Sequence, residues 1–182
     1  MTRETPGGVL IRPGMLADAP GLNAVYNHFV ENTAVTFDVT PMSLEERKRW
    51  LRRFADDGPY RLLVAVSHSA LVGFACSKQF RAKEAYATSV ETTIYLTPEE
   101  TGQGTGALLY AALFEALAAE DVHRAYAGIT IPNEASVALH RKLGFRNVGI
   151  YREVGRKFGR YWNVQWFEKG IESTGSDERS GA

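Results

Sequence analysis

Three glycines at alternate positions, Gly102, Gly104 and Gly106, separate a strand-like segment, "VETTIYL" (90–96), from a long apolar helix pattern. Glycine adopts positive φ angles freely and lets backbone N–H groups approach a ligand closely. The N-terminus of a helix favours an anion, because its first N–H groups are unpaired and the helix dipole is positive there. The loop therefore predicts a strand–loop–helix unit whose N–H groups, from Gln103 to Gly106, face a pyrophosphate.

The spacing of the glycines excludes two familiar phosphate-binding loops. A dinucleotide-binding fingerprint needs G-x-G-x-x-G, whereas this loop reads G-x-G-x-G. A P-loop needs Gly-Lys-Ser/Thr, and no lysine lies between Lys83 and Lys142. Two acids, Glu99 and Glu100, precede the glycines, and we expect them to be solvated and to point away from the anion. The cost of such an exposed charge is only about 0.2–1 kcal/mol.

The composition narrows the class of protein. A chain of 182 residues fits a single domain. Its 21 basic residues balance 21 acidic residues, which argues against a nucleic-acid or anionic membrane partner. No run approaches the roughly 20 apolar residues that span a bilayer, and the N-terminus lacks a signal-peptide core. The single cysteine, Cys76, excludes an intrachain disulfide and favours a reducing, cytoplasmic compartment.

Hydrophobic periodicity predicts the elements of the fold. Helices are expected over 16–32, 41–54, 106–120 and 133–145, and strands over 8–13, 60–67, 70–80, 84–97, 124–131, 146–159 and 160–170. The order β-α-α-β-β-β-α-β-α-β-β predicts an α+β domain with a mixed, largely antiparallel sheet of about seven strands and four helices. We expect this single domain to span residues 9–170, after a flexible N-terminus (1–8) and before a disordered polar tail (171–182).

Several segments together carry a family resemblance. "TGQGTGALLY" followed by "IPNEASVALHRKLGF" resembles the acetyl-CoA loop and the next segment of the GNAT acyltransferase superfamily. With "YNHFVENTAVTF", "RAKEAYATSVETTIYLTP" and "GRYWNVQWFEKG", most of residues 9–170 resembles the phosphinothricin N-acetyltransferase branch. The resemblance implies a three-layer α/β/α GNAT fold, acetyl-CoA as co-substrate and no metal. It also implies direct acetyl transfer to the α-amine of a small amino acid or analogue, such as phosphinothricin, methionine sulfoximine or methionine sulfone.

The loop departs from the family pattern in its side chains. Relatives usually read Gln/Arg-x-x-Gly-x-Gly/Ala, whereas Thr101 stands here at the first position, and the preceding acids stand where the branch is often basic. The backbone anion site is unaffected by these changes. The resemblance implies that acetyl-CoA is held by the following residues: Gly102, Gln103, Gly104, Thr105, Gly106, Asn133, Ser136, and the backbone of Ile94, Tyr95 and Leu96, where the strand splays.

Acetyl transfer to an amine needs a base for the amine and a proton for the departing thiolate. Strand alternation places Glu91, Thr93 and Tyr95 on one face, and a glutamate there is unusual unless the face lines a cleft. Glu91 is therefore the candidate base, acting through water, and the resemblance points to the same residue. A structural ion pair is the alternative. The resemblance implies that His140 protonates the thiolate, and simple packing is the alternative for that residue. Asn133 can serve both as a helix N-cap and as a contact to the pantetheine arm.

The acceptor side is expected just before the catalytic strand. Arg81 and Lys83 can form charge-assisted hydrogen bonds with a carboxylate or phosphinate, although loop cations are often simply solvated. Tyr86, in the same segment, and Thr93, on the strand that follows, are also expected to contact the acceptor. Phe37 aligns with an aromatic residue that the branch places over its substrate, with core packing as the alternative.

Other functions remain open from sequence alone. The same chemistry could act on a polyamine, an aminoglycoside or a protein N-terminus, although Arg81 and Lys83 disfavour cationic acceptors. A non-catalytic CoA-binding module is a third candidate. Cys76 lies in an apolar alternation, which indicates a small buried residue and argues against an acyl-cysteine route. The aromatic last strands and the resemblance imply a homodimer.

Overall fold

The computed structural model describes residues 2–4 and 8–172. The strands are β1 (Arg3–Glu4), β2 (Val9–Pro13), β3 (Leu62–Ser67), β4 (Ala70–Gln79), β5 (Ser89–Leu96), β6 (Arg124–Ile131), β7 (Arg146–Lys157) and β8 (Arg160–Gly170). The helices are α1 (Ala19–Asn32), α2 (Leu44–Leu51), α3 (Thr105–Ala118) and α4 (Glu134–Lys142).

All eight strands form one sheet in the order β1-β2-β3-β4-β5-β6-β8-β7. The β5–β6 pair is parallel and the other neighbouring pairs are antiparallel, so the predicted mixed, largely antiparallel sheet is confirmed. The sheet has one strand more than the seven predicted, because two residues, Arg3 and Glu4, pair with β2. Such a short strand carries no periodicity by which the sequence could reveal it.

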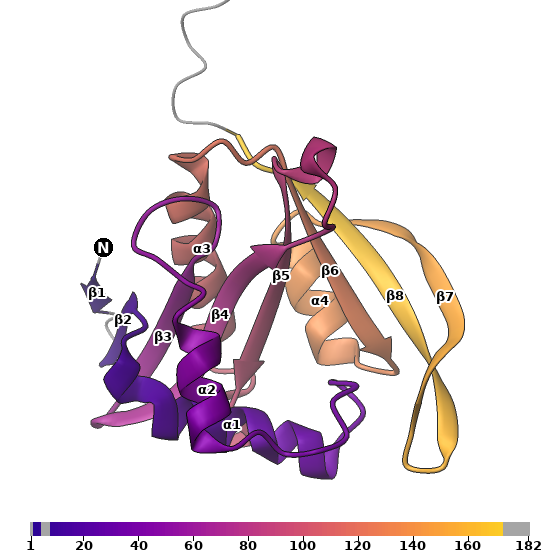
Figure 1. Ribbon diagram of the computed structural model, residues 1–182, viewed down its shortest axis with the longest axis horizontal. Helices are drawn as coiled ribbons and strands as arrows, with labels where there is room; N and C mark the ends of the chain where they lie inside the picture. Colours follow the sequence, from indigo (N-terminus) through magenta and orange to yellow (C-terminus); the bar gives the residue numbers. More distant parts are fainter. Residues whose placement is uncertain (1, 5–7, 173–182) are drawn as a thin grey trace, which may run out of the picture.

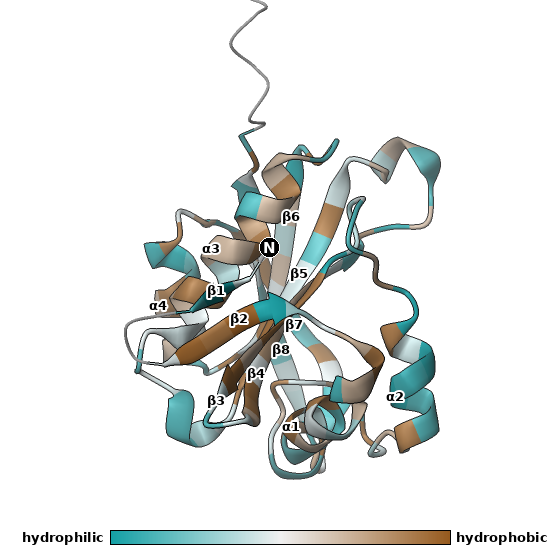
Figure 2. Ribbon diagram, turned by 90° about the vertical axis from the view of Figure 1, so that its left-hand side faces the viewer, coloured by the Kyte–Doolittle hydropathy of each residue, from teal (hydrophilic) through white to brown (hydrophobic). Residues whose placement is uncertain are grey.

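Helices cover both faces of the sheet, as Figures 1 and 2 show, and the predicted three-layer fold is confirmed. Helices α3 and α4 pack on one face through the larger core, which includes Leu109, Leu113, Ala127 and Phe167. Helices α1 and α2 pack on the other face through a smaller core around Phe74. We call this second face the α1–α2 face.

Different contacts hold the starts of α2 and α1. At α2, the Ser43 hydroxyl accepts from the Glu46 N–H, while the Glu46 carboxylate accepts from the Ser43 N–H at 2.8 Å. Asp18 also lies at an N-cap position, before α1, but its carboxylate binds no helix N–H. It accepts instead two hydrogen bonds of 2.7 Å from Arg12, which stands on β2.

Strand β5 is shorter than the 84–97 segment predicted from sequence. Residues Glu84–Tyr86 form a 3₁₀ turn, and the strand begins only at Ser89. The turn is held to the sheet by Phe80, whose ring stacks on Tyr126 of β6 with centroids 4.3 Å apart. The residue pattern of 84–88 predicts a strand, but ring contacts with the rest of the sheet hold this segment as a turn.

The sheet and the core include residues slightly outside 9–170, the predicted bounds of the domain. Strand β1 lies within the stretch predicted as flexible, and Ile171 is 9% exposed and packs in the larger core. The rest of the predicted polar tail, residues 173–182, lies outside the described residues. The boundaries of the domain and of its flexible ends stay predictions.

Strands β5 and β6 separate soon after they begin. Their pairing covers only three positions, from Ser89–Arg124 to Glu91–Tyr126. Strand β5 continues to pair with β4 as far as Leu96, and β6 continues to pair with β8. The edges that these two strands turn toward each other therefore carry unpaired backbone groups in the middle of the sheet, where Figure 1 shows the ribbons diverging.

Candidate active site

A cavity of about 500 Å³ occupies the opening between β5 and β6. It is lined by both strands, by the glycine loop with the start of α3, and by α4. The cavity brings together the following residues from the sequence predictions: Thr93, Ile94, Tyr95, Leu96, Gly102, Gly104, Gly106, Asn133, Ser136 and His140. The other predicted site residues do not line it, and these are Phe37, Arg81, Lys83, Tyr86, Glu91, Gln103 and Thr105.

The glycine loop has the conformation that its sequence predicts. Gly102 and Gly104 have φ angles of 83° and 89°, which a side chain would strain. Gly104 precedes α3, and the first hydrogen bonds to its carbonyl come from Ala107 and Leu108 at 3.0 and 3.2 Å. The N–H groups before them have no acceptor within the helix. They lie at the positive end of a 14-residue helix beside the cavity, which suits an anion.

Gly106 serves a different purpose, because it allows close packing. A β-carbon at this position would lie 3.2 Å from side-chain carbons of both Leu96 on β5 and Leu139 on α4. The start of α3 can therefore approach both walls of the cavity. A larger residue would push the loop away from the opening of the sheet.

The acids before the loop behave differently from each other. Glu99 is exposed, as expected. The prediction is wrong for Glu100, whose carboxylate accepts a 2.7 Å hydrogen bond from the hydroxyl of Thr105, a residue only 3% exposed. Glu100 therefore ties the loop to the first turn of α3. Thr105 is buried and does not line the cavity.

His140 is almost fully buried, at 2% exposure, among the rings of Tyr110, Phe145 and Phe167. Its Nδ1 lies 2.8 Å from the carbonyl oxygen of Ser136. Because a carbonyl only accepts hydrogen bonds, Nδ1 carries the proton of the neutral ring, and Nε2 is free to accept. Burial lowers the pKa of His140, although the hydrogen bond to Ser136 opposes this shift.

Tyr110 is a site residue that the sequence did not reveal. Its hydroxyl lies 3.2 Å from His140 Nε2, and it lines the cavity although it is fully buried. With Nε2 as acceptor, the Tyr110 hydroxyl donates this hydrogen bond. Burial raises the pKa of the Tyr110 phenol, and the Thr92 hydroxyl opposes the shift. Tyr110 occurs at a core position of the α3 apolar pattern, so periodicity assigns it to packing.

Glu91 stands on the α1–α2 face of β5, next to the cavity wall formed by Thr92 and Thr93. Its Oε1 lies 3.0 Å from Nζ of Lys78, its cross-strand partner on β4. The Glu91 side chain is 25% exposed and that of Lys78 is 51% exposed. A pair this open contributes at most about 1 kcal/mol to stability, so it does not account for the glutamate by itself.

Asn133 and Ser136 begin α4 at the far side of the cavity. Asn133 caps the helix, since its Oδ1 accepts a 3.2 Å hydrogen bond from the Ser136 N–H. Both residues also line the cavity. The predicted N-cap is therefore confirmed, and it leaves the amide nitrogen of Asn133 available to a ligand.

Among the predicted acceptor residues, Thr93 lines the cavity and the others lie around it. Arg81, Lys83 and Tyr86 are exposed, on the turn before β5. The Arg81 guanidinium lies 5.1 Å from the Phe80 ring centroid. Phe80 in turn stacks on Tyr126, which is the strand partner of Glu91. These contacts place the turn near Glu91. Phe37 is half-buried, on the loop between α1 and α2.

Cys76 has the properties of a packing residue. It is 1% exposed in the smaller core, and burial raises the pKa of its thiol to about 12. A thiol with such a pKa supplies almost no thiolate at neutral pH.

Across residues 2–4 and 8–172, no three His, Cys, Asp or Glu side chains cluster in a way that could hold a metal ion. None of the helices in this part of the chain is both long and apolar enough to cross a bilayer.

Comparisons with known proteins agree with this geometry. The Acetyltransferase (GNAT) domain family matches residues 11–166. A phosphinothricin N-acetyltransferase of Streptomyces coelicolor is 58% identical over 163 residues, which cover 88% of this chain and 95% of that protein. An L-methionine sulfoximine/L-methionine sulfone acetyltransferase of Pseudomonas paraeruginosa is 35% identical and covers 91% of this chain and 96% of its own length.

A solved structure shares the whole architecture. The GNAT superfamily phosphinothricin acetyltransferase of Sinorhizobium meliloti, crystallised in complex with acetyl-CoA, superposes with a TM-score of 0.85 at 29% identity. The match covers 96% of this chain and 95% of that chain. The family match and these relatives, together with a sheet that opens beside a glycine-rich helix N-terminus, show that the protein is an N-acetyltransferase. The chain belongs to the GNAT acetyltransferase family.

Proposed function

We propose that this N-acetyltransferase transfers acetyl from acetyl-CoA directly to the α-amine of a small amino acid or analogue, in the class of phosphinothricin, methionine sulfoximine and methionine sulfone. The observation that carries the proposal is the cavity between β5 and β6. It has an anion-binding helix N-terminus at one wall, and the candidate base Glu91 beside the other.

The donor is proposed to lie along the open edge of β5. The N–H groups of the glycine loop would hold the pyrophosphate, and Asn133 and Ser136 would contact the pantetheine arm. Unpaired backbone groups on the open edge of β5, at Ile94 and Leu96 on either side of Tyr95, would orient the thioester, since β6 has turned away from them. The Sinorhizobium relative, which was crystallised in complex with acetyl-CoA, supports acetyl-CoA as the donor.

Glu91 is proposed as the base that takes the proton of the attacking amine, directly or through water. The Tyr110 hydroxyl and His140 are proposed to serve the departing thiolate together. His140 Nε2 accepts the only hydroxyl proton of Tyr110 in the resting site. To protonate the thiolate, the Tyr110 hydroxyl would turn from Nε2 to the sulfur and transfer this proton, which solvent then replaces. Cys76 is buried and protonated, which supports direct transfer without an acyl-cysteine.

An anionic acceptor is favoured by two buried cations on the α1–α2 face. Arg47 is 1% exposed and its Nη2 has no hydrogen-bond partner, while Lys157 is 4% exposed. Neither forms an ion pair with any residue in the described part of the chain. Asp38 acts on both cations but is exposed, so the buried charge on this face is positive. It attracts a carboxylate or phosphinate more than a polyamine or aminoglycoside.

The test is thiol release from acetyl-CoA with a panel of acceptors. The panel contains phosphinothricin, methionine sulfoximine, methionine sulfone, common amino acids, spermidine, an aminoglycoside and a peptide with a free N-terminus. Turnover confined to the amino acids and their analogues is the expected result. Preference for spermidine, the aminoglycoside or the peptide would overturn the acceptor assignment. Silence across the panel with acetyl-CoA still bound would indicate a non-catalytic CoA-binding module.

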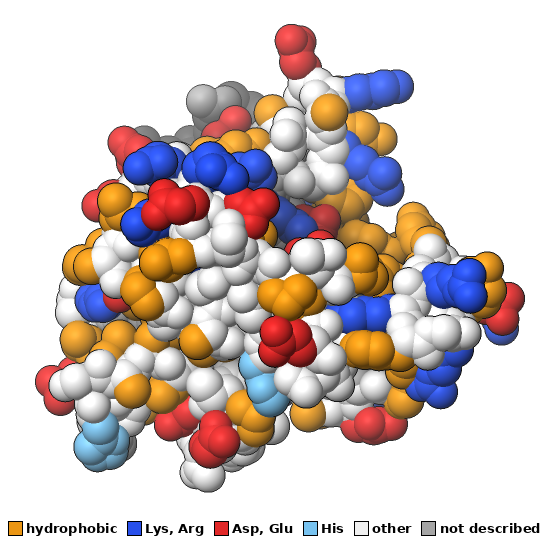
Figure 3. Space-filling view, turned by 60° about the horizontal axis from the view of Figure 1, so that its bottom comes forward, with side chains coloured by type: hydrophobic (Ala, Val, Ile, Leu, Met, Phe, Trp, Pro, Cys, Tyr) orange, Lys and Arg blue, Asp and Glu red, His pale blue; other side chains and the backbone are white. Residues whose placement is uncertain are grey.

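We extend the proposal to a homodimer in the cytoplasm. Strand β7 and the turn after it expose apolar side chains, namely Val148, Ile150, Tyr151, Val154 and Phe158, each at least 45% exposed. Figure 3 shows hydrophobic side chains on the projecting β7–β8 hairpin, at the right of the view. Such a surface fits an interface. Light scattering that gives a monomer at micromolar concentration would contradict the dimer. The single free thiol, Cys76, suits a reducing compartment.

A further inference from the structure

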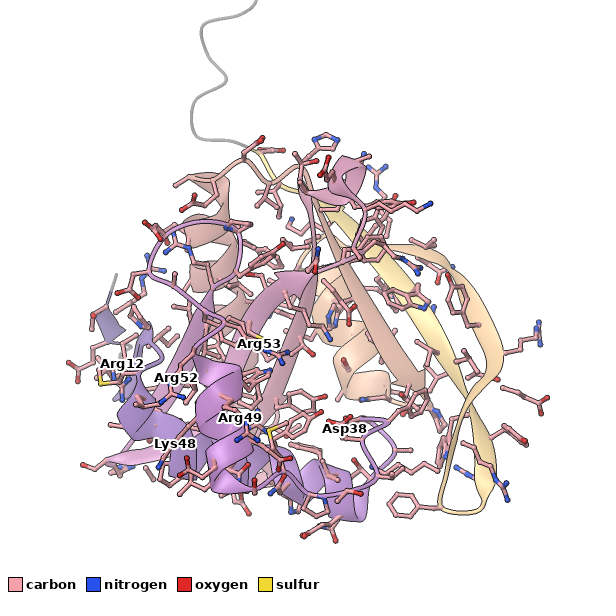
Figure 4. The ribbon with its side chains drawn as sticks, viewed as in Figure 1. Arg12, Asp38, Lys48, Arg49, Arg52 and Arg53 are labelled. Atoms are coloured by element: carbon pink, nitrogen blue, oxygen red, sulfur yellow. The ribbon has the colours of Figure 1, made fainter. Side chains whose placement is uncertain are left out.

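The loop that joins α1 to α2, residues 33–43, contributes to the cavity wall. Val35 lines the cavity directly, and Thr36 and Phe37 follow it. In Figure 4 the labelled Asp38 marks this loop, which lies between the α1–α2 pair and the β7–β8 hairpin. The shape of the cavity at this end therefore depends on what holds the loop in place.

The hairpin holds the loop through Lys157, the last residue of β7. Lys157 Nζ donates a 2.9 Å hydrogen bond to the carbonyl oxygen of Thr36, across 121 positions of sequence. Burial lowers the pKa of this lysine, and Asp38 opposes the shift. Lysine is rarely buried to this extent unless its ammonium group has a specific partner. Here the partner is the backbone of the α1–α2 loop.

The hairpin also touches the loop at Gly155, two residues earlier on β7. A β-carbon at this position would lie only 2.2 to 2.5 Å from three atoms of the Phe37 ring. Such distances are too short for any side chain without movement of the ring. Glycine at position 155 therefore lets the Phe37 ring lie directly against the hairpin backbone.

The loop is tied from the opposite side by Tyr26 of α1. The Tyr26 hydroxyl lies 2.8 Å from Thr36 Oγ1 and donates a 2.6 Å hydrogen bond to Asp38. The Tyr26 ring packs edge-on against the Tyr95 ring, with centroids 5.1 Å apart, and Tyr95 lines the cavity. Thr36 is thus held between the hairpin on one side and the cavity wall on the other.

We infer that Lys157 and Gly155 are positioning residues of the acceptor site, which act through Thr36 and Phe37. The inference rests on the proposed function, because it assumes that the acceptor binds at this end of the cavity. The hairpin then does more than present an apolar surface. It fixes the loop that carries Val35 and Phe37, and so it sets how tightly an acceptor is enclosed.

The first test replaces Lys157 with methionine, which keeps most of the side-chain volume and removes the donor. The matched control is Arg156→Met, since Arg156 is the adjacent residue, is exposed and carries the same charge. We expect Lys157→Met to raise KM for the acceptor about tenfold, in line with a lost hydrogen bond from a charged group. KM for acetyl-CoA should stay unchanged in both variants, and Lys157→Arg should recover part of the acceptor affinity.

The second test uses glycine variants on the same strand. Gly155→Ala should displace Phe37 and raise KM for the acceptor, whereas Gly149→Ala should not, because nothing lies within 4 Å of a β-carbon there. Phe37→Leu alone and combined with Gly155→Ala should show similar acceptor KM values, since the smaller side chain removes the clash. Additive losses in the double variant would contradict a contact through Phe37.

A third readout does not need turnover. Amide hydrogen exchange in peptides covering 33–43 should accelerate in Lys157→Met and Gly155→Ala and remain unchanged in Arg156→Met and Gly149→Ala. If the wild-type protein acetylates no acceptor in the panel, the proposed function fails while the exchange still tests the positioning contacts. Unchanged exchange would overturn the inference. Faster exchange with unchanged acceptor KM in an active enzyme would overturn it as well.

Discussion

The imidazole Nδ1 of His140 donates to the carbonyl oxygen of Ser136, one turn earlier in the same helix, at 2.8 Å. This bond fixes a neutral ring in an aromatic pocket, and burial lowers the pKa of His140 in the folded protein. In the unfolded chain the pKa of His140 is about 6.5, which is higher than in the folded protein. Below about pH 6.5 the unfolded chain therefore binds a proton that the folded protein does not, and this favours unfolding. The stabilisation is complete above about pH 6.5 and is lost as the pH falls below it.

The first prediction is therefore a pH dependence of stability that belongs to His140. The free energy of unfolding in urea should fall more between about pH 7.5 and pH 5.5 in the wild type than in His140→Gln. His123→Gln is the control, because His123 is exposed. A wild-type slope that persists in His140→Gln would show that other groups are responsible.

The second prediction concerns Glu91. Glu91→Gln should lower kcat by at least about a hundredfold, as expected for loss of a general base, while calorimetry shows unchanged affinity for acetyl-CoA. Glu168→Gln is a matched control. Glu168 flanks Tyr126 from β8 as Glu91 does from β5, and it pairs with Arg124 at 4.0 Å. Equal effects in the two variants would assign Glu91 a structural role.

The third prediction separates backbone strain from anion binding in the glycine loop. Gly104→Ala and Gly58→Ala both place a side chain at positive φ, 89° and 74°, where no atom lies within 4 Å. Each should cost about 1–2 kcal/mol of stability. Only Gly104→Ala should weaken acetyl-CoA binding, by about tenfold or more, because the strain shifts N–H groups at the start of α3. Equal affinities would remove the loop from the donor site.

The fourth prediction uses the different surroundings of the two acids before the loop. Glu99→Arg should improve acetyl-CoA affinity by less than about tenfold, since Glu99 is exposed and its charge is screened. Glu100→Arg should bring no gain, because it also breaks the hydrogen bond with Thr105. Glu100→Gln isolates the charge, as an amide oxygen can still accept from the Thr105 hydroxyl. A hundredfold improvement in either variant would place these side chains in contact with the pyrophosphate.

Much of the fold follows from local patterns. Helix α3 and strand β6 have long periodic signals, and the Ser43 capping box and the Asn133 N-cap are readable from residue type alone. The sequence predicts a strand where the structure has a turn at Glu84–Tyr86, because the turn contacts the Phe80 ring, which stacks on Tyr126 about 40 positions later in the chain. Patterns within a segment carry no information about such a partner.

The site divides in the same way. The cavity wall at the glycine loop could be predicted, because the glycine spacing indicates its backbone geometry. The open edge of β5 is implied only by the family resemblance. Tyr110 could not, since an aromatic residue at a core position of a helix has the same pattern whether or not its hydroxyl faces a cavity. The role of Lys157 could not be predicted either, because a lysine next to a hairpin turn is normally solvated. Nothing in the sequence indicates that its ammonium group is buried and donates to the backbone of a distant loop.

The short seam between β5 and β6 has a consequence for how the molecule holds together. Within the sheet, only three paired positions join β1–β5 to β6–β8, and the space beyond them is the cavity. A co-substrate in that space would bridge the two parts, so its binding energy would add to the coupling between them. Without it, the strands β6–β8 with α4 should open as a separate cooperative unit before the rest of the chain unfolds.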